Sequence, residues 1–305
     1  PVASTGAIQG WLTWRPVGGD VISGLGGHGK FDEGSGTTAA DSSGTGNTGT
    51  LGGGPTWATG KINGGLSFDG VAVGNNNVNA PSYNLTNSGP LTYSLWIYLR
   101  SIGGDLFRGD TFIARGGNDR GLYVNSNYAL KYETDGLPKA TSTNNAISIN
   151  QWAHVVVTAD GTSSAANIHF YVNGVEVAKQ ATTDGGPGSP SAGLWIGGYG
   201  ATYDTLDGVI DDVRVYNRAL SAAEVSSLYL RGGGWQYRKK ITIDRTRVAG
   251  PLTDFPVLIR LANDPNLPGK AHASGNDILF TSSDGTTKLS HEIEKYVSAT
   301  GELVA

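Results

Sequence analysis

Short runs of alternating apolar and polar residues dominate the chain, separated by turns rich in Gly, Asn, Asp and Pro. A period of two is typical of strands in a sheet with one buried and one solvated face. The expected strands span residues 66–68, 91–99, 111–114, 121–124, 153–159, 168–172, 175–178, 194–197 and 209–216. The pattern therefore predicts an all-β protein built as an antiparallel sandwich.

Two local signals predict how particular elements begin and turn. Asn173–Gly174 lies between two predicted strands, and this dipeptide strongly favours a two-residue hairpin turn. One helix is expected from Ser221 as N-cap, with Glu224 completing a capping box and Gly232 beyond the helix end.

The apolar positions of the strands predict the core. Its expected members are Phe68, Leu95, Ile97, Val155, Val157, Phe170, Val172, Trp195, Ile196 and Val213. Trp96 and Trp152 also lie in apolar strands, so we expect them to be buried rather than to bind ligands.

The glycine run at 231–235 is the strongest domain boundary, because a basic, strand-rich composition follows it. We expect a large domain over 25–231, a small one over 235–305, and an N-terminal strand segment over 1–24. About 70 residues are marginal for an independent core. The opening "PVASTGAIQG" and the closing "YVSATGELVA" share Val, Thr and Gly in register. This raises the question of whether the two ends belong to one kind of element.

Composition narrows the functional classes. The net charge is −4 and only 16% of residues are charged, so no basic surface for nucleic acid is expected. No apolar run reaches about 18 residues, so no membrane insertion is expected. Cysteine is absent, which excludes disulfides and thiolate metal sites. The chain starts at Pro1 without Met, so we expect a processed, secreted protein at the cell surface; the alternative is a cytosolic fragment.

Four sequence segments follow one another along the chain: "KFDEGSGTTAADSSGTGNTGTL", "GGPTWATGKINGGLSFDG", "FYVNGVEVA" and "GVIDDVRVYNRALSAAEVSSLY". They resemble laminin-G-like jelly rolls of the concanavalin A-like lectin/glucanase superfamily. The resemblance implies a jelly-roll β-sandwich for the large domain. Two positions depart from it: Gly29 stands where the family usually has Trp, and 71–73 stands where it often has paired Asp.

The segment 235–305 is similar to a small β-domain of unknown function that neighbours such jelly rolls in prokaryotic surface proteins. That family continues with further strands after the segment matching "TGELVA", whereas this chain stops there. The N-terminal "TGAIQGWLTW" resembles the missing strands. The resemblance therefore implies an incomplete second β-domain that residues 1–24 could complete.

This resemblance predicts a strand pair between Leu303–Ala305 and a segment from Ile8 to Trp14. The residues expected to carry it are Ile8, Trp11, Trp14, Leu303 and Val304. We expect the partner strand to come from another copy of the chain. Same-chain closure, a tandem repeat and an ordinary N-terminal strand packed on the jelly roll remain alternatives.

No catalytic residues are expected. Glucanases of this superfamily place two Glu around an Asp on one strand, and no E-x-D-x-E occurs here. Asp211 and Asp212 are adjacent, so we expect them to point to opposite faces of a strand. "HEIEK" begins like a zinc-protease helix but has Lys295 where the second His would stand.

A structural Ca²⁺ is the expected cofactor, since Asp32 and Asp41 flank a flexible glycine-rich loop. The jelly-roll resemblance places the first strand near the last, which would bring Asp211 or Asp212 toward Asp32. The alternative is that Asp41 caps a turn with the following Ser-Ser-Gly and that Asp32 is solvated.

Loop residues Tyr199 and Tyr203, with Asn118 and Asp119, are the candidate glycan-binding groups.

The resemblances and the candidate sites lead to two hypotheses for the function of the chain. The first is a non-catalytic extracellular structural and adhesive protein that assembles with copies of itself, head to tail, into a filament or repeat array. The alternative is a lectin-like carbohydrate-binding module of a larger secreted protein, with cell-surface or matrix glycans as partners.

Overall fold

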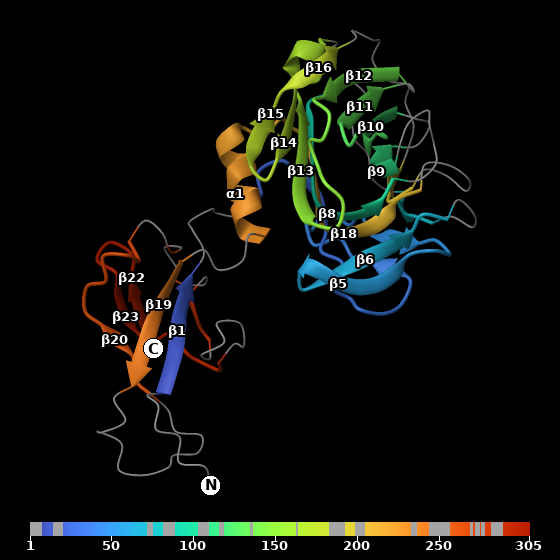
Figure 1. Cartoon of the computed structure of the whole chain (residues 1–305). Helices are drawn as coiled ribbons and strands as arrows, with labels where there is room; N and C mark the ends of the chain where they lie inside the picture. The colour runs from blue at the N-terminus through green and yellow to red at the C-terminus, as the bar shows by residue number, and fades with distance from the viewer. Residues whose placement is uncertain are drawn as a thin grey trace. The chain divides into compact units, whose positions relative to one another are not determined.

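Two units make up the chain in the computed structural model (Figure 1). The large unit is Val21–Gly232, and the small unit combines Pro1–Asp20 with Gly233–Ala305. The structure describes all residues except 1–7, 15–20, 72–75, 82–88, 103–109, 116–118, 135–136, 163, 183–192, 199–204, 233–236, 244–256, 269–270, 272–274, 276–277 and 282–288. The N-terminal segment and the C-terminal segment thus belong to one unit.

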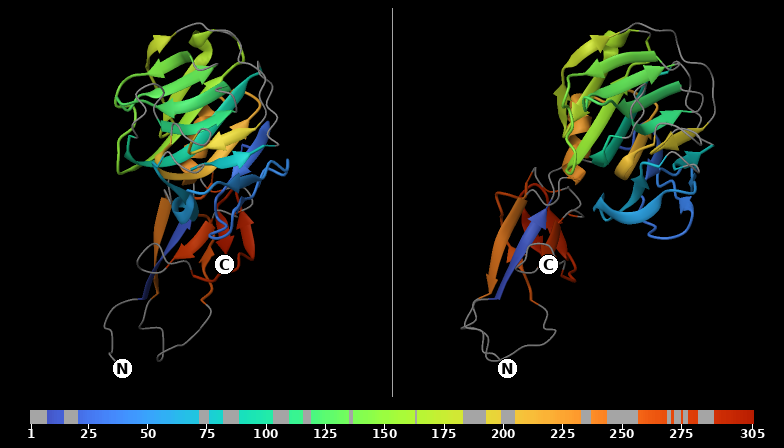
Figure 2. Two further views of the ribbon diagram at one scale, coloured as in Figure 1. Left: turned by 90° about the vertical axis from the view of Figure 1, so that its right-hand side faces the viewer. Right: turned by 45° about the vertical axis from the view of Figure 1, so that its right-hand side comes forward.

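Two antiparallel sheets form the large unit (Figure 2). The eight-stranded sheet has the order β15-β14-β13-β8-β18-β6-β5, with β2 also paired to β18. Its strands are β2 (Leu25–Gly29), β5 (Thr56–Ile62), β6 (Gly64–Asp69), β8 (Leu91–Ser101), β13 (Trp152–Ala159), β14 (Ile168–Val172), β15 (Val175–Val177) and β18 (Asp207–Tyr216). A short 3₁₀ helix, η2 (Ala165–Asn167), precedes β14.

The nine-stranded sheet has the order β16-β12-β11-β10-β9-β17-β7-β4-β3. Its strands are β3 (Thr38–Ala39), β4 (Gly49–Leu51), β7 (Val78–Ala80), β9 (Asp110–Arg115), β10 (Asp119–Val124), β11 (Leu130–Thr134), β12 (Leu137–Ser142), β16 (Lys179–Thr182) and β17 (Leu194–Ile196). The large unit is therefore an all-β antiparallel sandwich, which confirms the predicted fold class.

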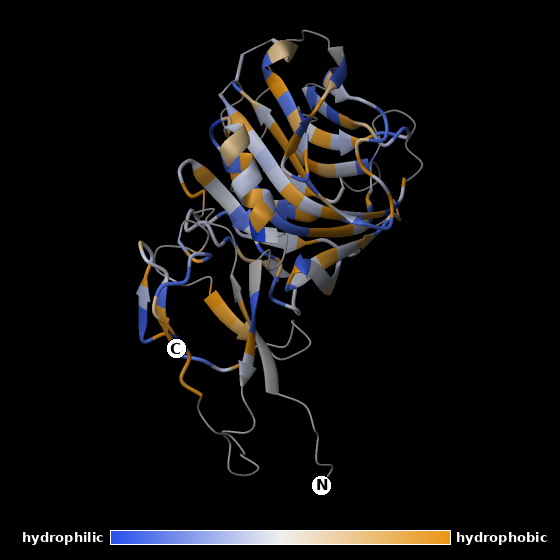
Figure 3. Cartoon of the chain, turned by 60° about the vertical axis from the view of Figure 1, so that its left-hand side comes forward, coloured by the Kyte–Doolittle hydropathy of each residue, from blue (hydrophilic) through white to orange (hydrophobic). Residues whose placement is uncertain are grey.

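Hydrophobic and hydrophilic residues alternate along strands of the large unit (Figure 3). In β8, Leu95, Ile97 and Leu99 lie in the cluster between the two sheets. On the other side of this sheet, the helix α1 (Ala222–Gly232) packs through Val225 and Leu228 in a second apolar cluster. The eight-stranded sheet is thus covered on one side by the other sheet and partly on its outer side by a helix.

The predicted turn and helix cap are confirmed. Asn173 and Gly174 have φ of 52° and 80°, the left-handed geometry of a primed hairpin turn. Ser221 N–H donates to Glu224 Oε2 at 2.9 Å, and Glu224 N–H donates to Ser221 Oγ at 3.4 Å. Gly232 is the last residue of α1 rather than the residue beyond it. A Cβ there would lie 2.2 Å from the Trp96 ring, so the close approach requires glycine.

The core prediction is correct except at Val172 and Trp195, which are partly buried. Trp195 lies between Leu194 and Ile196 on β17, and both neighbours lie in the core cluster. Because consecutive residues of a strand project to opposite faces, Trp195 must lie on the outer face. Trp152 is also partly buried, while Trp96 is buried on the helix side of its sheet.

The small unit contains two three-stranded sheets, with orders β19-β1-β21 and β20-β23-β22. Its strands are β1 (Ile8–Trp14), β19 (Tyr237–Ile243), β20 (Arg260–Leu261), β21 (Ile278–Thr281), β22 (Lys295–Val297) and β23 (Glu302–Val304). Its core includes Leu12, Phe280 and Leu303, one from each of three distant segments. The small unit therefore contains the predicted terminal strands, but in two different sheets.

Phe170→Ala and Trp195→Ala should separate core from outer-face aromatic residues. Phe170 is fully buried, so its truncation should lower the free energy of unfolding by about 3–5 kcal/mol. Trp195→Ala should cost clearly less, because Trp195 is already partly exposed. Urea denaturation of both variants measures the difference, and equal losses would contradict the assignment of Trp195 to the outer face.

Candidate functional site

The Asp41 carboxylate organises the turn that follows β3. Oδ1 accepts hydrogen bonds from the N–H groups of His28 and Ser43, each at 2.9 Å. Oδ2 accepts from Ser43 Oγ, Thr45 Oγ1 and Asn47 N–H at 2.8, 2.9 and 2.8 Å. Partial burial alone would raise the pKa of Asp41, but these hydrogen bonds outweigh it and lower the pKa to about 2. The contacts match the turn-capping alternative.

Asp32 and Asp211 meet at the turn between β5 and β6. Gly64 N–H donates to Asp32 Oδ1 at 2.9 Å, and Ile62 N–H donates to Asp211 Oδ2 at 2.6 Å. Asp211 is completely buried, and its Oδ1 has no hydrogen-bond partner. Burial first, and then the charges of Asp212 and Asp32, raise the pKa of Asp211 to about 7. The jelly-roll resemblance implied that Asp211 or Asp212 lies toward Asp32, and Asp211 is the one that contacts the same turn.

Asp212 lies at a bulge in β18 and has a φ of 46°. Its Oδ1 lies 2.6 Å from His28 Nε2, and Arg214 Nε donates to its Oδ2 at 3.1 Å. These contacts, with the positive charge of Arg214, overcome burial and lower the pKa of Asp212. His28 and Arg214 are directly opposed on neighbouring strands, on the same side as Asp211. The expectation that the two aspartates face opposite ways is therefore wrong, because the bulge interrupts the alternation.

The calcium site stays a prediction, and the contacts reduce the number of its candidate ligands. No group of three or more His, Cys, Asp or Glu side chains suited to a metal is found in the part of the chain that the structure describes. Asp41 and Asp212 have protein donors on both oxygens. Asp32 and Asp211 retain oxygens that a cation could use, so these two are the remaining candidate ligands.

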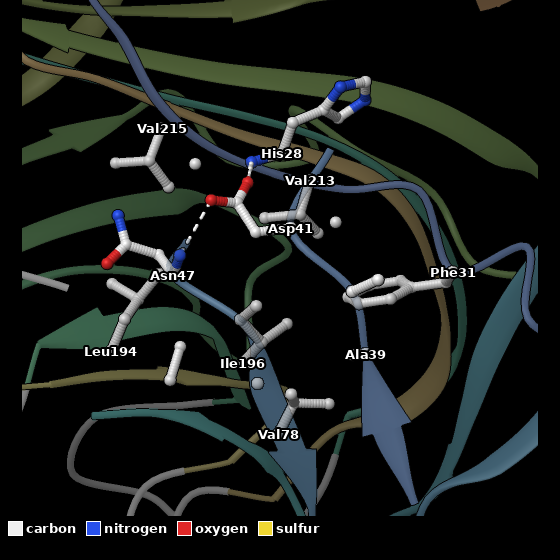
Figure 4. A pocket seen from close by; sticks show the side chains of 15 residues that line it. His28, Phe31, Ala39, Asp41, Asn47, Val78, Leu194, Ile196, Val213 and Val215 are labelled. Atoms are coloured by element: carbon white, nitrogen blue, oxygen red, sulfur yellow. Dashed lines mark hydrogen bonds between the residues drawn. The ribbon is translucent and has the colours of Figure 1, made fainter. Parts of the chain in front are cut away.

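A small cavity lies between the two sheets beside β2 (Figure 4). Its volume is about 30 Å³, and its wall includes Val78, Ile196 and Val213. The imidazole of His28 points away from the other lining side chains, and the Asp41 carboxylate lies between the backbone N–H groups of His28 and Asn47 (Figure 4). A space of this size holds one or two water molecules and cannot admit a sugar ring.

Three of the four predicted glycan-binding residues, Tyr199, Tyr203 and Asn118, lie outside the described residues. Asp119 begins β10, where its backbone pairs with Arg115, and its side chain is also outside the description. Their role stays a prediction.

Sequence reasoning missed a row of buried polar groups on the outer face of the nine-stranded sheet. Lys131 Nζ lies 2.7 Å from Glu133 Oε1, and both side chains are buried. Lys131 is directly opposed to Tyr123, which is completely buried. The alternation of Lys131 and Glu133 with the core residues Leu130 and Tyr132 could have placed both charged residues on the outer face of the sheet. Burial of these charges could not be read from the alternation alone.

Strand β1 is the middle strand of its sheet. Ile8 pairs with Ile243 on β19, and Trp11 pairs with Lys240 on β19 and with Thr281 on β21. Trp14 pairs likewise with Tyr237 and Ile278. This ladder joins the N-terminal strand to both neighbours over most of its length.

The expected ladder between β1 and β23 is not the one observed. Leu303 pairs with Leu261 and Tyr296, and Val304 pairs with Arg260 and Lys295. Leu12 of β1 and Leu303 instead share one apolar cluster, and both are completely buried. Among the described residues, β1 and β23 are therefore connected through a shared apolar cluster and have no common ladder.

Residues 72–226, just over half of the chain, match the family described as the concanavalin A-like lectin/glucanases superfamily. The chain belongs to this family. No protein with a curated description matches it. Among the described residues, no helix is long and apolar enough to cross a membrane.

Several solved structures share the fold at low identity. Domain 4 of AbnA, a GH43 extracellular arabinanase from Geobacillus stearothermophilus in complex with arabinotriose, has a TM-score of 0.50 at 22% identity. That match covers 67% of this chain and 98% of the domain. The binding domain of Paraclostridial Mosquitocidal Protein 1 has a TM-score of 0.54 at 16% identity, covering 68% and 52%. Trypanosoma rangeli sialidase has a TM-score of 0.53 at 16% identity, covering 72% and 36%. The chain thus spans about half of the second protein and about a third of the third.

Asp41→Ala should destabilise the large unit whether or not calcium is present. The change leaves the N–H groups of His28, Ser43 and Asn47 without their acceptor, which should cost about 1–3 kcal/mol. Thermal melting in calcium and in EDTA measures both cases. A loss seen only with calcium would identify Asp41 as a metal ligand and contradict the capping role.

Asp211 should make stability fall as the pH rises. Because its pKa is raised from 3.8 to about 7, the folded state binds this proton more tightly than the unfolded state. Its stabilising contribution is complete below about pH 4 and is lost as the pH rises through about 7. Asp211→Asn, which keeps an acceptor for Ile62 N–H, should flatten the free energy of unfolding over this window. Urea denaturation at several pH values tests this, with the exposed Glu292→Gln as control; an unchanged slope in Asp211→Asn would refute it.

Proposed function

We propose that this chain is a non-catalytic extracellular structural and adhesive protein whose copies join head to tail by exchanging strand β1. The jelly roll serves as its lectin-like module. The observation that carries the proposal is the place of β1, which is paired on both sides while β19 and β21 share no ladder with each other. Without β1, the described strands of this sheet have no common neighbour.

The position of β1 in the sequence favours exchange between copies. The whole large unit, Val21–Gly232, separates β1 from the strands that it joins. Because every copy carries the same β1, the strand of a neighbour can make the same hydrogen bonds and bury the same Leu12. The donor strand and the acceptor site are different surfaces, so each copy can give one strand and receive another. Such heterologous contacts form open filaments unless the rotation closes a ring.

The adhesive part of the proposal rests on the family and on the fold. The arabinanase domain that shares this fold was solved with arabinotriose. The absence of E-x-D-x-E from the sequence supports a non-catalytic role. An extracellular location agrees with a chain that is rich in Gly, Asn, Ser and Thr.

A second candidate is a lectin-like module of a larger secreted protein, in which β1 closes the small unit of its own chain. The observation that favours it is the set of contacts by which one chain completes the small unit by itself. The structural difference between the two candidates is which copy supplies β1 to the small unit.

A double variant, Gln9→Cys with Thr242→Cys, distinguishes them, because these residues are directly opposed in the β1–β19 ladder. Opposed residues of an antiparallel pair lie within the range of a disulfide, and the chain has no other cysteine. Exchange between copies should give a ladder of covalent oligomers after oxidation, measured on a non-reducing denaturing gel.

Gln9→Cys alone serves as the control, since it can form nothing larger than a dimer. A cross-linked monomer as the sole product of the double variant would contradict strand exchange. Deletion of residues 1–14 should also abolish assembly, and a peptide with the sequence of residues 1–14 should bind the truncated chain. Electron microscopy and fluorescence anisotropy measure these two effects.

A further inference from the structure

Four side chains form a row across the outer face of the eight-stranded sheet. Trp152 is directly opposed to Tyr98, Tyr98 to Val209, and Val209 to Ser67. Directly opposed residues project to the same face, and the neighbours of Tyr98, Ile97 and Leu99, lie in the core. The row therefore lies on the side away from the other sheet, and all four side chains are partly exposed.

Trp152 and Tyr98 form an aromatic surface within this row. Their ring centroids are 5.8 Å apart, with the planes at 60°. The next row along the sheet differs, because Trp96 there is stacked under Tyr229 of α1 at 5.7 Å and is buried. The helix thus covers one aromatic row, whereas Trp152 and Tyr98 stay partly exposed.

Polar side chains joined to one another by hydrogen bonds lie beside the aromatic pair. Arg100 follows Tyr98 by two residues on β8, and its Nε lies 2.7 Å from Asp207 Oδ1. Arg100 Nη1 donates to Ser67 Oγ at 3.1 Å, and Ser101 Oγ donates to Asp207 Oδ2 at 2.6 Å. The charges of Arg100 and Asp207 balance, and side-chain exposures of 35% and 24% leave both within reach of a ligand.

We propose that this surface, formed by Trp152, Tyr98, Arg100, Asp207 and Ser67, binds a chain of neutral sugars. The apolar C–H faces of a sugar ring suit the indole and phenol rings, whose large faces favour such contacts. Its hydroxyl groups need both donors and acceptors, which the guanidinium, the carboxylate and the hydroxyl supply. A balanced ion pair gives no net attraction for a charged sugar. An open sheet face suits an extended chain better than a single sugar.

This inference rests on the lectin-like part of the proposed function and not on strand exchange. Binding of the full chain to arabinan, xylan and mannan, with polygalacturonate as the charged comparison, can be measured by affinity electrophoresis. Native protein should bind at least one neutral polymer more tightly than polygalacturonate. Trp152→Ala and Tyr98→Ala should each weaken this binding roughly tenfold or more. Trp152→Phe and Tyr98→Phe should retain most of it.

Trp195→Ala is the matched control, since Trp195 is a partly exposed Trp on the outer face of the other sheet. It should leave binding unchanged, and melting curves check that every variant is folded. The inference fails if native protein binds a neutral polymer but Trp152→Ala does not weaken it, and the lectin-like proposal then survives. If native protein binds none of the neutral polymers, both fail. A change of oligomeric state in Trp152→Ala, without a change in sugar binding, would make the surface a contact between copies and would also overturn the inference.

Discussion

The bulge at Asp212 is the constraint on which the large unit depends. It lets β18 pair with β8 along one side while β6 and β2 share the other side in succession. The Asp212 carboxylate holds this geometry by contacting His28 of β2 and Arg214 of β18. A buried carboxylate stays ionised only with such partners. The contact therefore joins the first strand of the sandwich to its last strand.

Other features follow from that junction. Because β2 lies against β18, Asp41 can reach the backbone of His28 and order the turn after β3. The chain beyond β18 then enters α1, whose last residue lies against Trp96 of β8. The helix does not cover the whole outer face of the eight-stranded sheet. Beyond the end of the helix, aromatic and polar side chains on this face are partly exposed. The outer face of this sheet therefore has two parts: the buried polar contacts of Asp212, and the partly exposed surface around Trp152 and Tyr98.

The small unit depends on a different constraint, the supply of a middle strand. Leu12, Phe280 and Leu303 are far apart in sequence and form one apolar cluster. A segment of about 70 residues has little core of its own, so the loss of β1 would expose both an apolar cluster and two strand edges. A strand that completes a neighbour's fold can also link copies, which connects the stability of this unit with the proposed assembly.

The local elements follow from signals in short stretches of the sequence. Alternation predicted most strands of the sandwich, Asn173–Gly174 predicted the hairpin, and Ser221 with Glu224 predicted the start of the helix, because these signals act over a few residues. Packing of the two sheets sets which face of β17 is buried, and hence that Trp195 lies on the outer face. Tertiary pairing likewise turns Asp212 toward His28 at the bulge, and it pairs β1 with β19 and β21 while β23 joins another sheet. These outcomes depend on pairings between segments that are distant in the sequence. The pattern of a strand indicates that one face is apolar, but it does not indicate which segment packs against that face.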